Sequence, residues 1–157
     1  MVELREREEV IEFLDDLSWD IEGKRREEAA IRFLRRVSDE IFDEIRSSVY
    51  LYAPHREVLG KCLPFTRTES AKVETHPVLK STLPMVEVKT TFIYLAPQLE
   101  EHGIESIVGI LAHEVAHHYV GILGQESEDS AWRLVEQWGF QKEVEAAREE
   151  LSPEDGV

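Results

Sequence analysis

The sequence predicts an α+β fold, in which helices at both ends of the chain enclose a β-rich middle. Apolar residues recur every three or four positions through most of residues 3–47 and again in 104–150, which is typical of amphipathic helices. Between these stretches, residues 49–97 contain β-branched and aromatic runs separated by prolines, which is typical of short strands and loops.

A chain of 157 residues is long enough to bury a sizeable core and too short for two full domains. We therefore expect a single domain over residues 1–150, with a helical N-terminal part at 1–48 and a core part at 49–150. Residues 151–157 are predicted to form a flexible tail.

The N-terminal part is predicted to contain two helices. The first covers residues 3–18, and a break follows at 20–23. The second helix is longer and runs from about Lys24 to Ser47. Its apolar stripe consists of Ala30, Ile31, Leu34, Val37, Ile41 and Ile45.

The middle of the chain is predicted to form a small mixed or antiparallel sheet. Residues 49–53 are β-rich and end at a proline, whereas residues 54–85 contain four prolines and predict loops and edge strands. Residues 86–95 carry the strongest strand signal of the chain.

Two further helical stretches are predicted after this strand. One extends from about Ile104 to Leu123 and ends before Gly124. The next covers residues 126–150 and is expected to be interrupted near Gly139.

The charge balance excludes several classes of partner. There are 33 acidic and 18 basic residues, which give a net charge of −15, so we expect no binding to nucleic acid or to anionic membranes. The chain has no long apolar run and no signal peptide, and Cys62 is its single cysteine, so a cytoplasmic location is expected. The lack of asparagine and the high charge content are typical of heat-adapted proteins.

The residues that indicate a function are His113-Glu114-Val115-Ala116-His117. On a helix, residues four apart project from one face, so His113 and His117 are placed to bind one metal ion. Glu114 lies about 100° further around the helix, close enough to hold a metal-bound water. This H-E-x-x-H pattern is typical of zinc metallopeptidases, in which two neutral histidines leave zinc open to a third protein ligand and a water.

The third ligand is open among three acidic residues of the following helix: Glu126, Glu128 and Asp129. The metzincin pattern requires Gly and His at positions that Val120 and Leu123 occupy here, so that class of site is excluded.

At Glu128-Asp129-Ser130-Ala131 the chain resembles the gluzincin peptidases, in which the helix after the motif bears Glu-x-x-Ala. The resemblance covers about residues 86–140 and implies that Glu128 is the third ligand of a Zn²⁺ ion. It departs from the family at Trp132, where many gluzincins carry an aspartate that accepts a hydrogen bond from a ligand histidine.

The same resemblance implies a zincin-like fold, with the active-site helix followed by a helix that bears the ligand glutamate. In that family an edge strand pairs with substrate backbone, so part of residues 86–95 is expected to bind an extended peptide by strand addition.

The predicted function is a zinc-dependent peptidase with a peptide or protein substrate. His113, His117 and Glu128 hold zinc, and Glu114 activates the zinc-bound water and passes its proton to the leaving amine. The alternative is a non-catalytic or latent metal-binding zincin domain that acts as a binding or regulatory module. In the latent form, acidic residues of 149–155 reach the open zinc position.

Other aromatic side chains are predicted to have structural roles. His118 points about 100° away from His117, which favours packing or surface exposure over metal binding. Trp132 and Trp138 are expected in the core. Four tyrosines are candidate oxyanion donors for which packing is favoured: Tyr50, Tyr52, Tyr94 and Tyr119. Three histidines are expected in loops: His55, His76 and His102.

Overall fold

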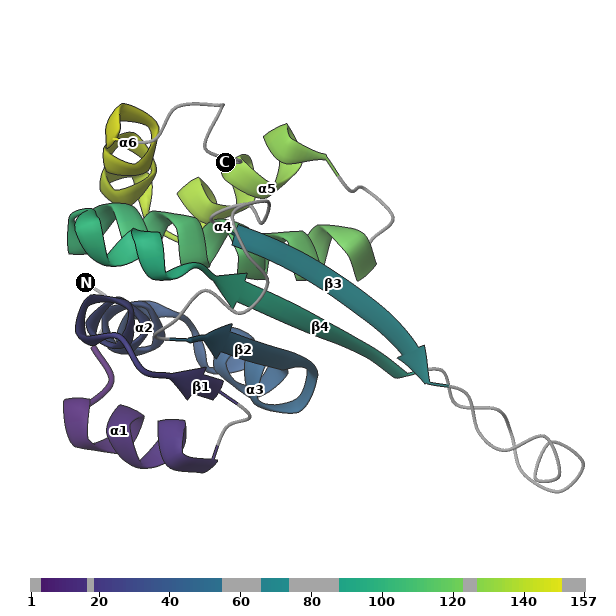
Figure 1. Ribbon diagram of the computed structural model, residues 1–157. Helices are drawn as coiled ribbons and strands as arrows, with labels where there is room; N and C mark the ends of the chain where they lie inside the picture. The colour runs from purple at the N-terminus through teal and green to yellow at the C-terminus, as the bar shows by residue number, and fades with distance from the viewer. Residues whose placement is uncertain (1–3, 17–18, 55–65, 74–87, 123–126, 151–157) are drawn as a thin grey trace, which may run out of the picture.

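A computed structural model describes residues 4–16, 19–54, 66–73, 88–122 and 127–150 of the chain. Within these ranges the chain forms six α-helices, one 3-10 helix and a four-stranded sheet (Figure 1), which confirms the α+β prediction. None of the helices in these ranges is long and apolar enough to cross a membrane. The predicted tail at 151–157 lies outside the described residues.

The elements follow one another in three groups. The N-terminal group is α1 (Arg7–Asp16), β1 (Trp19–Ile21), α2 (Lys24–Arg36) and α3 (Asp39–Ser48). The middle group is β2 (Val49–Ala53), β3 (Thr66–Val73), β4 (Val88–Leu95) and the 3-10 helix η2 (Pro97–Glu101). The C-terminal group is α4 (Ile104–Ile122), α5 (Glu128–Gln137) and α6 (Gln141–Glu150).

The N-terminal part differs from the prediction at two places. The single helix expected from Lys24 to Ser47 is broken at Val37 and Ser38, because Ser38 caps a new helix by accepting a hydrogen bond from the Ile41 amide. The break expected at residues 20–23 overlaps β1, a three-residue strand that pairs with β2. Its short length gives it no periodicity that a sequence pattern can show.

The sheet has the strand order β1-β2-β4-β3. β1, β2 and β4 are parallel, and β3 is antiparallel to β4. The sheet is therefore mixed, as one of the two predicted alternatives had it. A purely antiparallel sheet, the other alternative, is wrong because two of the three strand pairings are parallel. Parallel pairing of β1 with β2 follows from the intervening helices α2 and α3, because parallel neighbours require a long crossover connection.

β4 is an interior strand. It pairs with β3 along its whole length and with β2 from Thr91 to Tyr94. Both backbone edges of β4 are occupied from Thr91 to Tyr94, so the expectation that part of residues 86–95 binds substrate by strand addition is wrong for residues 91–94. Among the described strands, β3 is the edge strand on this side of the sheet, and it lies next to α4 (Figure 1).

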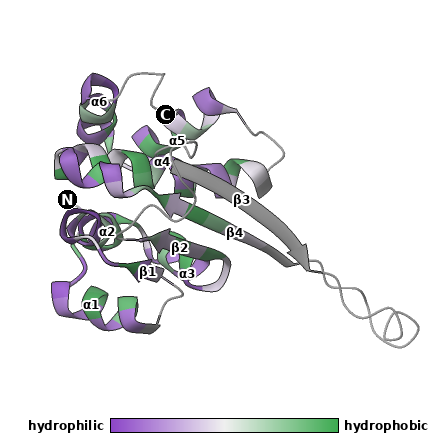
Figure 2. Cartoon of the chain, viewed as in Figure 1, coloured by the Kyte–Doolittle hydropathy of each residue, from purple (hydrophilic) through white to green (hydrophobic). Residues whose placement is uncertain are grey.

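The two faces of the sheet differ in burial. Leu51, Ile93 and Leu95 are buried and belong to one hydrophobic cluster with residues of α2 and α4. On the other face, Phe92 is 42% exposed and lies 5.6 Å from Tyr50, measured between ring centroids. The helices around the sheet carry both hydrophobic and hydrophilic residues (Figure 2). The core therefore lies on the face of the sheet that carries these three residues, and all six α-helices contribute side chains to it.

α4 is the central helix of the C-terminal group, with α5 and α6 packed on the side away from the sheet (Figure 1). Gly109 makes the close approach of α6 possible, because a Cβ atom there would overlap the backbone carbonyl of Glu143. The interruption predicted near Gly139 is confirmed: this residue has a φ of 92° and separates α5 from α6.

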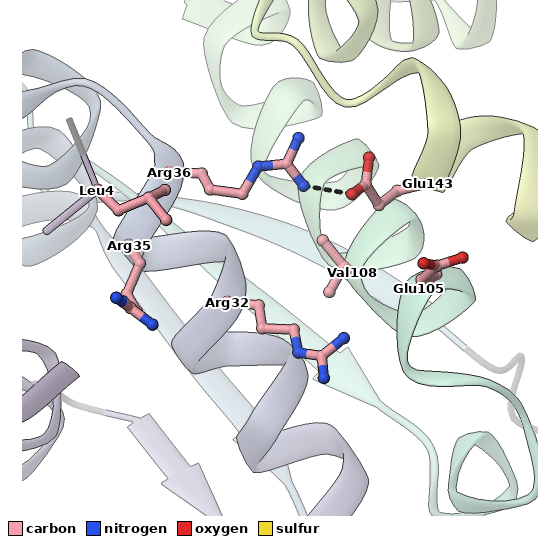
Figure 3. Close-up of a pocket in the computed structure, with 7 residues that line it drawn as sticks. All are labelled: Leu4, Arg32, Arg35, Arg36, Glu105, Val108 and Glu143. Carbon is pink, nitrogen blue, oxygen red and sulfur yellow. Dashed lines mark hydrogen bonds and ion pairs between the residues drawn. The ribbon is translucent and has the colours of Figure 1, made fainter. Parts of the chain in front are cut away.

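α2 is the basic helix of this acidic protein, and its arginines bind other elements. Arg36 forms an ion pair with Glu143 of α6 and donates to the Gly139 carbonyl at 2.8 Å. Arg35 donates to the Arg5 carbonyl at 2.8 Å. These side chains line a pocket of about 150 Å³ between α2 and α4 (Figure 3). Because Arg35 and Arg36 are already partnered, we assign the pocket to the scaffold.

Candidate metal centre

The H-E-x-x-H residues lie in the C-terminal half of α4. The neighbouring apolar residues Val115 and Ala116 are fully buried, so the helix is fixed in its rotation by the core. His113 is 2% exposed and Glu114 is 6% exposed, and His117 is half-buried. The helix thus presents two imidazoles one turn apart from a rigid element.

The atoms that could bind a metal converge on one point. His113 Nε2 and His117 Nε2 are 3.1 Å apart. Glu128 Oε2 lies 2.8 Å from His113 Nε2, and Glu128 Oε1 lies 3.2 Å from His117 Nε2. The three residues place one ligand atom each within 4.8 Å of the others. The structure therefore brings together the three residues that the sequence and the gluzincin resemblance singled out.

This donor set fits a zinc ion. Two imidazole nitrogens and one carboxylate oxygen are ligands that zinc accepts, and bonds of about 2.0–2.1 Å in tetrahedral geometry place such atoms roughly 3.3 Å apart. The observed separations require only small side-chain shifts to reach that value. Other transition metals accept the same ligands, so the donor set alone does not select zinc among them.

The protonation of His113 also suits a metal ligand, which must be neutral. Burial, together with the positive charges of His117 and Arg148, lowers the pKa of His113 to about 3. At neutral pH this imidazole is therefore uncharged and keeps a lone pair for a ligand.

Glu128 is the first residue of α5, and its position depends on the cap of that helix. Ser127 accepts a hydrogen bond from the Ser130 amide at 3.0 Å and fixes the first turn. The Glu128 side chain is 67% exposed, in contrast to the nearly buried His113. The site therefore has a rigid, buried side on α4 and an exposed side on α5.

The other candidates for the third ligand do not meet the two histidines. Asp129 is exposed and does not belong to the group of converging ligand atoms. Glu126 lies outside the described residues. The described part of the structure thus favours Glu128.

His118 has a structural environment, as predicted. Its Nε2 donates to Glu44 Oε1 at 2.9 Å, and its Nδ1 lies 2.6 Å from Thr91 Oγ1. Both ring nitrogens are therefore engaged within the chain, and the side chain links α4 to α3 and β4. No lone pair of this imidazole is left for a metal ion.

The remaining candidates lie away from the cluster or outside the described residues. Tyr119 packs edge-to-face against Trp138 and His118. Tyr52 and Tyr94 form a cross-strand pair on the sheet, with ring centroids 6.1 Å apart. The residues outside the description are His55, His76 and Cys62.

Trp132 has a role that the sequence pattern did not reveal. It was expected in the core and is 8% exposed, but its ring also stacks on His113 with a centroid distance of 3.9 Å and an interplanar angle of 23°. Arg148 of α6 lies over the same indole, 5.2 Å from the ring centroid. The spacing of four residues from Glu128 was the available signal, because it places Trp132 on the same face of α5.

No family model, no curated protein and no solved structure matches the chain. The interpretation of the site therefore rests on its own residues and their geometry.

Proposed function

We propose that the protein is a zinc-dependent peptidase. The observation that supports this most directly is the convergence of His113, His117 and Glu128, with Glu114 next to the first histidine on the same helix. When bound, zinc supplies Lewis acidity, which makes a water acidic near neutral pH and polarises a peptide carbonyl.

The chain itself would provide the ligands and the proton transfer. His113 and His117 hold the ion from α4, and Glu128 holds it from α5. Glu114 is a carboxylate outside the ligand group, and in this proposal it takes the proton of the attacking water. The same carboxylate then delivers that proton to the leaving amine.

The substrate in this proposal is an extended peptide segment bound along β3. Among the described strands, β3 pairs only with β4, and it lies next to the helix that carries the histidines. An edge strand offers unpaired backbone N–H and C=O groups that an added strand can use. A peptide bound this way would pass along α4 with its backbone held by hydrogen bonds.

The first test is the metal content of the purified protein after zinc loading and removal of free metal. We expect one zinc per wild-type chain and none in His113→Ala. The matched control is His118→Asn, which changes a histidine of the same helix outside the cluster and should retain zinc. The proposed metal site would be contradicted if the wild-type protein retained no zinc, or if His113→Ala retained one zinc per chain.

The second test separates the peptidase from a metal-binding module without turnover. Wild-type protein should hydrolyse an unfolded protein or a peptide pool, and Glu114→Gln should retain zinc while its activity falls by about 10²–10⁴-fold. Absence of hydrolysis by zinc-loaded wild type would favour the binding or regulatory module. Activity of Glu114→Gln equal to the wild type would exclude Glu114 as the base.

A further inference from the structure

One ring nitrogen of the proposed ligand His113 has no hydrogen-bond partner in the part of the chain that the structure describes. Its Nδ1 is buried and unpartnered among the residues that the structure describes. Histidines that ligate metals usually donate this second N–H to a carboxylate, a carbonyl or a water, which fixes the ring orientation. The His113 ring must therefore be oriented by some other contact.

Trp132 provides that contact. The indole stacks on the imidazole with ring centroids 3.9 Å apart and planes inclined by 23°. His117 closes the site from another direction, with its ring edge-to-face to His113 at 4.5 Å. Rotation of the His113 ring about its Cβ–Cγ bond would break the near-parallel stack, so the indole holds the imidazole plane while Nε2 faces Glu128.

Arg148 adds a positive charge to this arrangement. Its guanidinium lies over the Trp132 ring, at the 5.2 Å distance typical of a cation–π contact. It is one of three basic residues in positions 97–157, a stretch with 14 acidic residues. When His113 binds a metal, its imidazole gains positive character, and a fixed cation near the stack opposes that change.

We propose that Trp132 and Arg148 are positioning and tuning residues of the metal centre that act in opposite directions. The indole of Trp132 takes the place of a hydrogen-bond acceptor and favours metal binding by holding His113 in its ligating orientation. The guanidinium of Arg148 weakens metal binding by charge repulsion. This inference rests on the proposed metal site, but it does not depend on whether the protein hydrolyses peptides.

The experiment is a measurement of zinc affinity by competition with a chromogenic chelator, at fixed pH and at two salt concentrations. Trp132→Leu should weaken zinc binding by about 10–100-fold, the range typical for loss of an orienting partner of a ligand. Trp132→Phe preserves a stacking ring and should stay within a few-fold of the wild type. The matched control is Trp138→Leu, because Trp138 packs on Tyr119 and should leave zinc affinity unchanged.

The charge is tested separately on exposed residues, whose substitution leaves the core intact. Arg148→Gln should tighten zinc binding by about two- to fivefold at low salt, and the gain should shrink at high salt because the guanidinium is exposed. Arg133→Gln removes the same charge from an exposed position of α5 that is not among the groups acting on His113, and it should change little.

Three outcomes would overturn the inference while leaving the metal site intact. These are equal zinc affinities for Trp132→Leu and Trp138→Leu, a large loss in Trp132→Phe, and a gain in Arg133→Gln as large as that in Arg148→Gln. A wild-type chain that binds no zinc overturns the metal site and this inference together. Zinc binding without hydrolysis overturns only the peptidase.

Discussion

The helices α2 and α4 pack against each other at the centre of the molecule, yet they use their polar side chains in opposite ways. α2 carries six basic residues, and Arg26, Arg35 and Arg36 each contact a carboxylate or carbonyl of another segment. α4 has no lysine or arginine, and its two proposed ligand histidines turn toward one another and toward Glu128.

The comparison of α2 with α4 distinguishes polar side chains that bind other parts of the chain from polar side chains that are available to a ligand. The α2 arginines engage the chain itself and tie α2 to β4, η2 and α6. Within α4, His118 is of the same kind, since both of its nitrogens have partners in Thr91 and Glu44. His113 is the opposite case, because its Nδ1 has no partner among the described residues and its Nε2 belongs to the converging group. Burial alone does not distinguish the two histidines.

The largest expected effect is the gain in the free energy of unfolding when zinc binds to the proposed site on α4 and α5. At free zinc about 1,000-fold above its dissociation constant, the wild-type free energy of unfolding should rise by about 4.1 kcal/mol. His117→Ala should show no zinc-dependent gain, because it removes a ligand. Urea unfolding with added zinc, and with EDTA as the reversal, measures both. An equal gain in the variant would place zinc somewhere other than this cluster.

The next effect is on the scaffold side, at the start of α2. Glu100 accepts from the Arg26 amide at 3.0 Å and lies 3.8 Å from the buried Arg26 Nε, which has no hydrogen-bond partner among the described residues. Burial lowers the pKa of Arg26, and Glu100 opposes that shift. Glu100→Ala should destabilise the fold by about 2–3 kcal/mol, somewhat less than for a fully buried pair because the carboxylate is partly exposed.

Glu100→Gln is the control for this change, since it keeps an acceptor for the backbone amide and should cost less than the alanine variant. Both variants should bind zinc with wild-type affinity when folded. A loss of zinc affinity parallel to the loss of stability would remove the distinction between scaffold and site.

The smallest effect concerns pH and the contact between α1 and α2. A hydrogen bond from Arg7, together with the charges of Arg7 and Arg32, holds the pKa of Glu28 below its ordinary value. The folded pKa is thus lower than the unfolded one, so this carboxylate stabilises the fold above the unfolded value and loses its contribution as pH falls through the folded value. Below about pH 4.5 we expect a loss of less than about 1 kcal/mol.

Urea midpoints at pH 7 and pH 3 measure this loss when Glu28→Gln is compared with the wild type, because the variant lacks the titrating group. The difference between the two proteins should shrink at the lower pH. An unchanged difference would show that the carboxylate contributes nothing through its charge.

Much of the fold could be predicted from periodicity, and the exceptions have physical causes. The apolar stripe of residues 24–47 continues across Val37 and Ser38, so it concealed the capped break that Ser38 makes between α2 and α3. The direction of strand pairing is set by contacts between distant segments, which local patterns do not contain. Pattern therefore located β2 and β4, but it did not show that β4 is interior.

The part of the candidate site that lies on a single helix could be predicted from the sequence. His113 and His117 lie on one turn of α4, so their spacing in sequence determines their distance in space. Glu128 came from the gluzincin resemblance, and its meeting with the histidines depends on how α5 packs on α4. The stack of Trp132 on His113 and the placement of Arg148 over it depend on how three helices pack. The spacing of Trp132 from Glu128 indicates only that the two residues share a face of α5.

The place of Glu128 at the first position of α5 has a consequence for the time scale of metal exchange. Helix ends open locally far more often than the whole domain unfolds, and within the described residues the side chain of Ser127 caps this end. The proposed ligand Glu128 is thus at a helix end, whereas the two histidines are on a helix whose neighbouring apolar residues are buried in the core. We expect the residence time of a bound ion to follow the fraying of that helix end rather than the lifetime of the native fold.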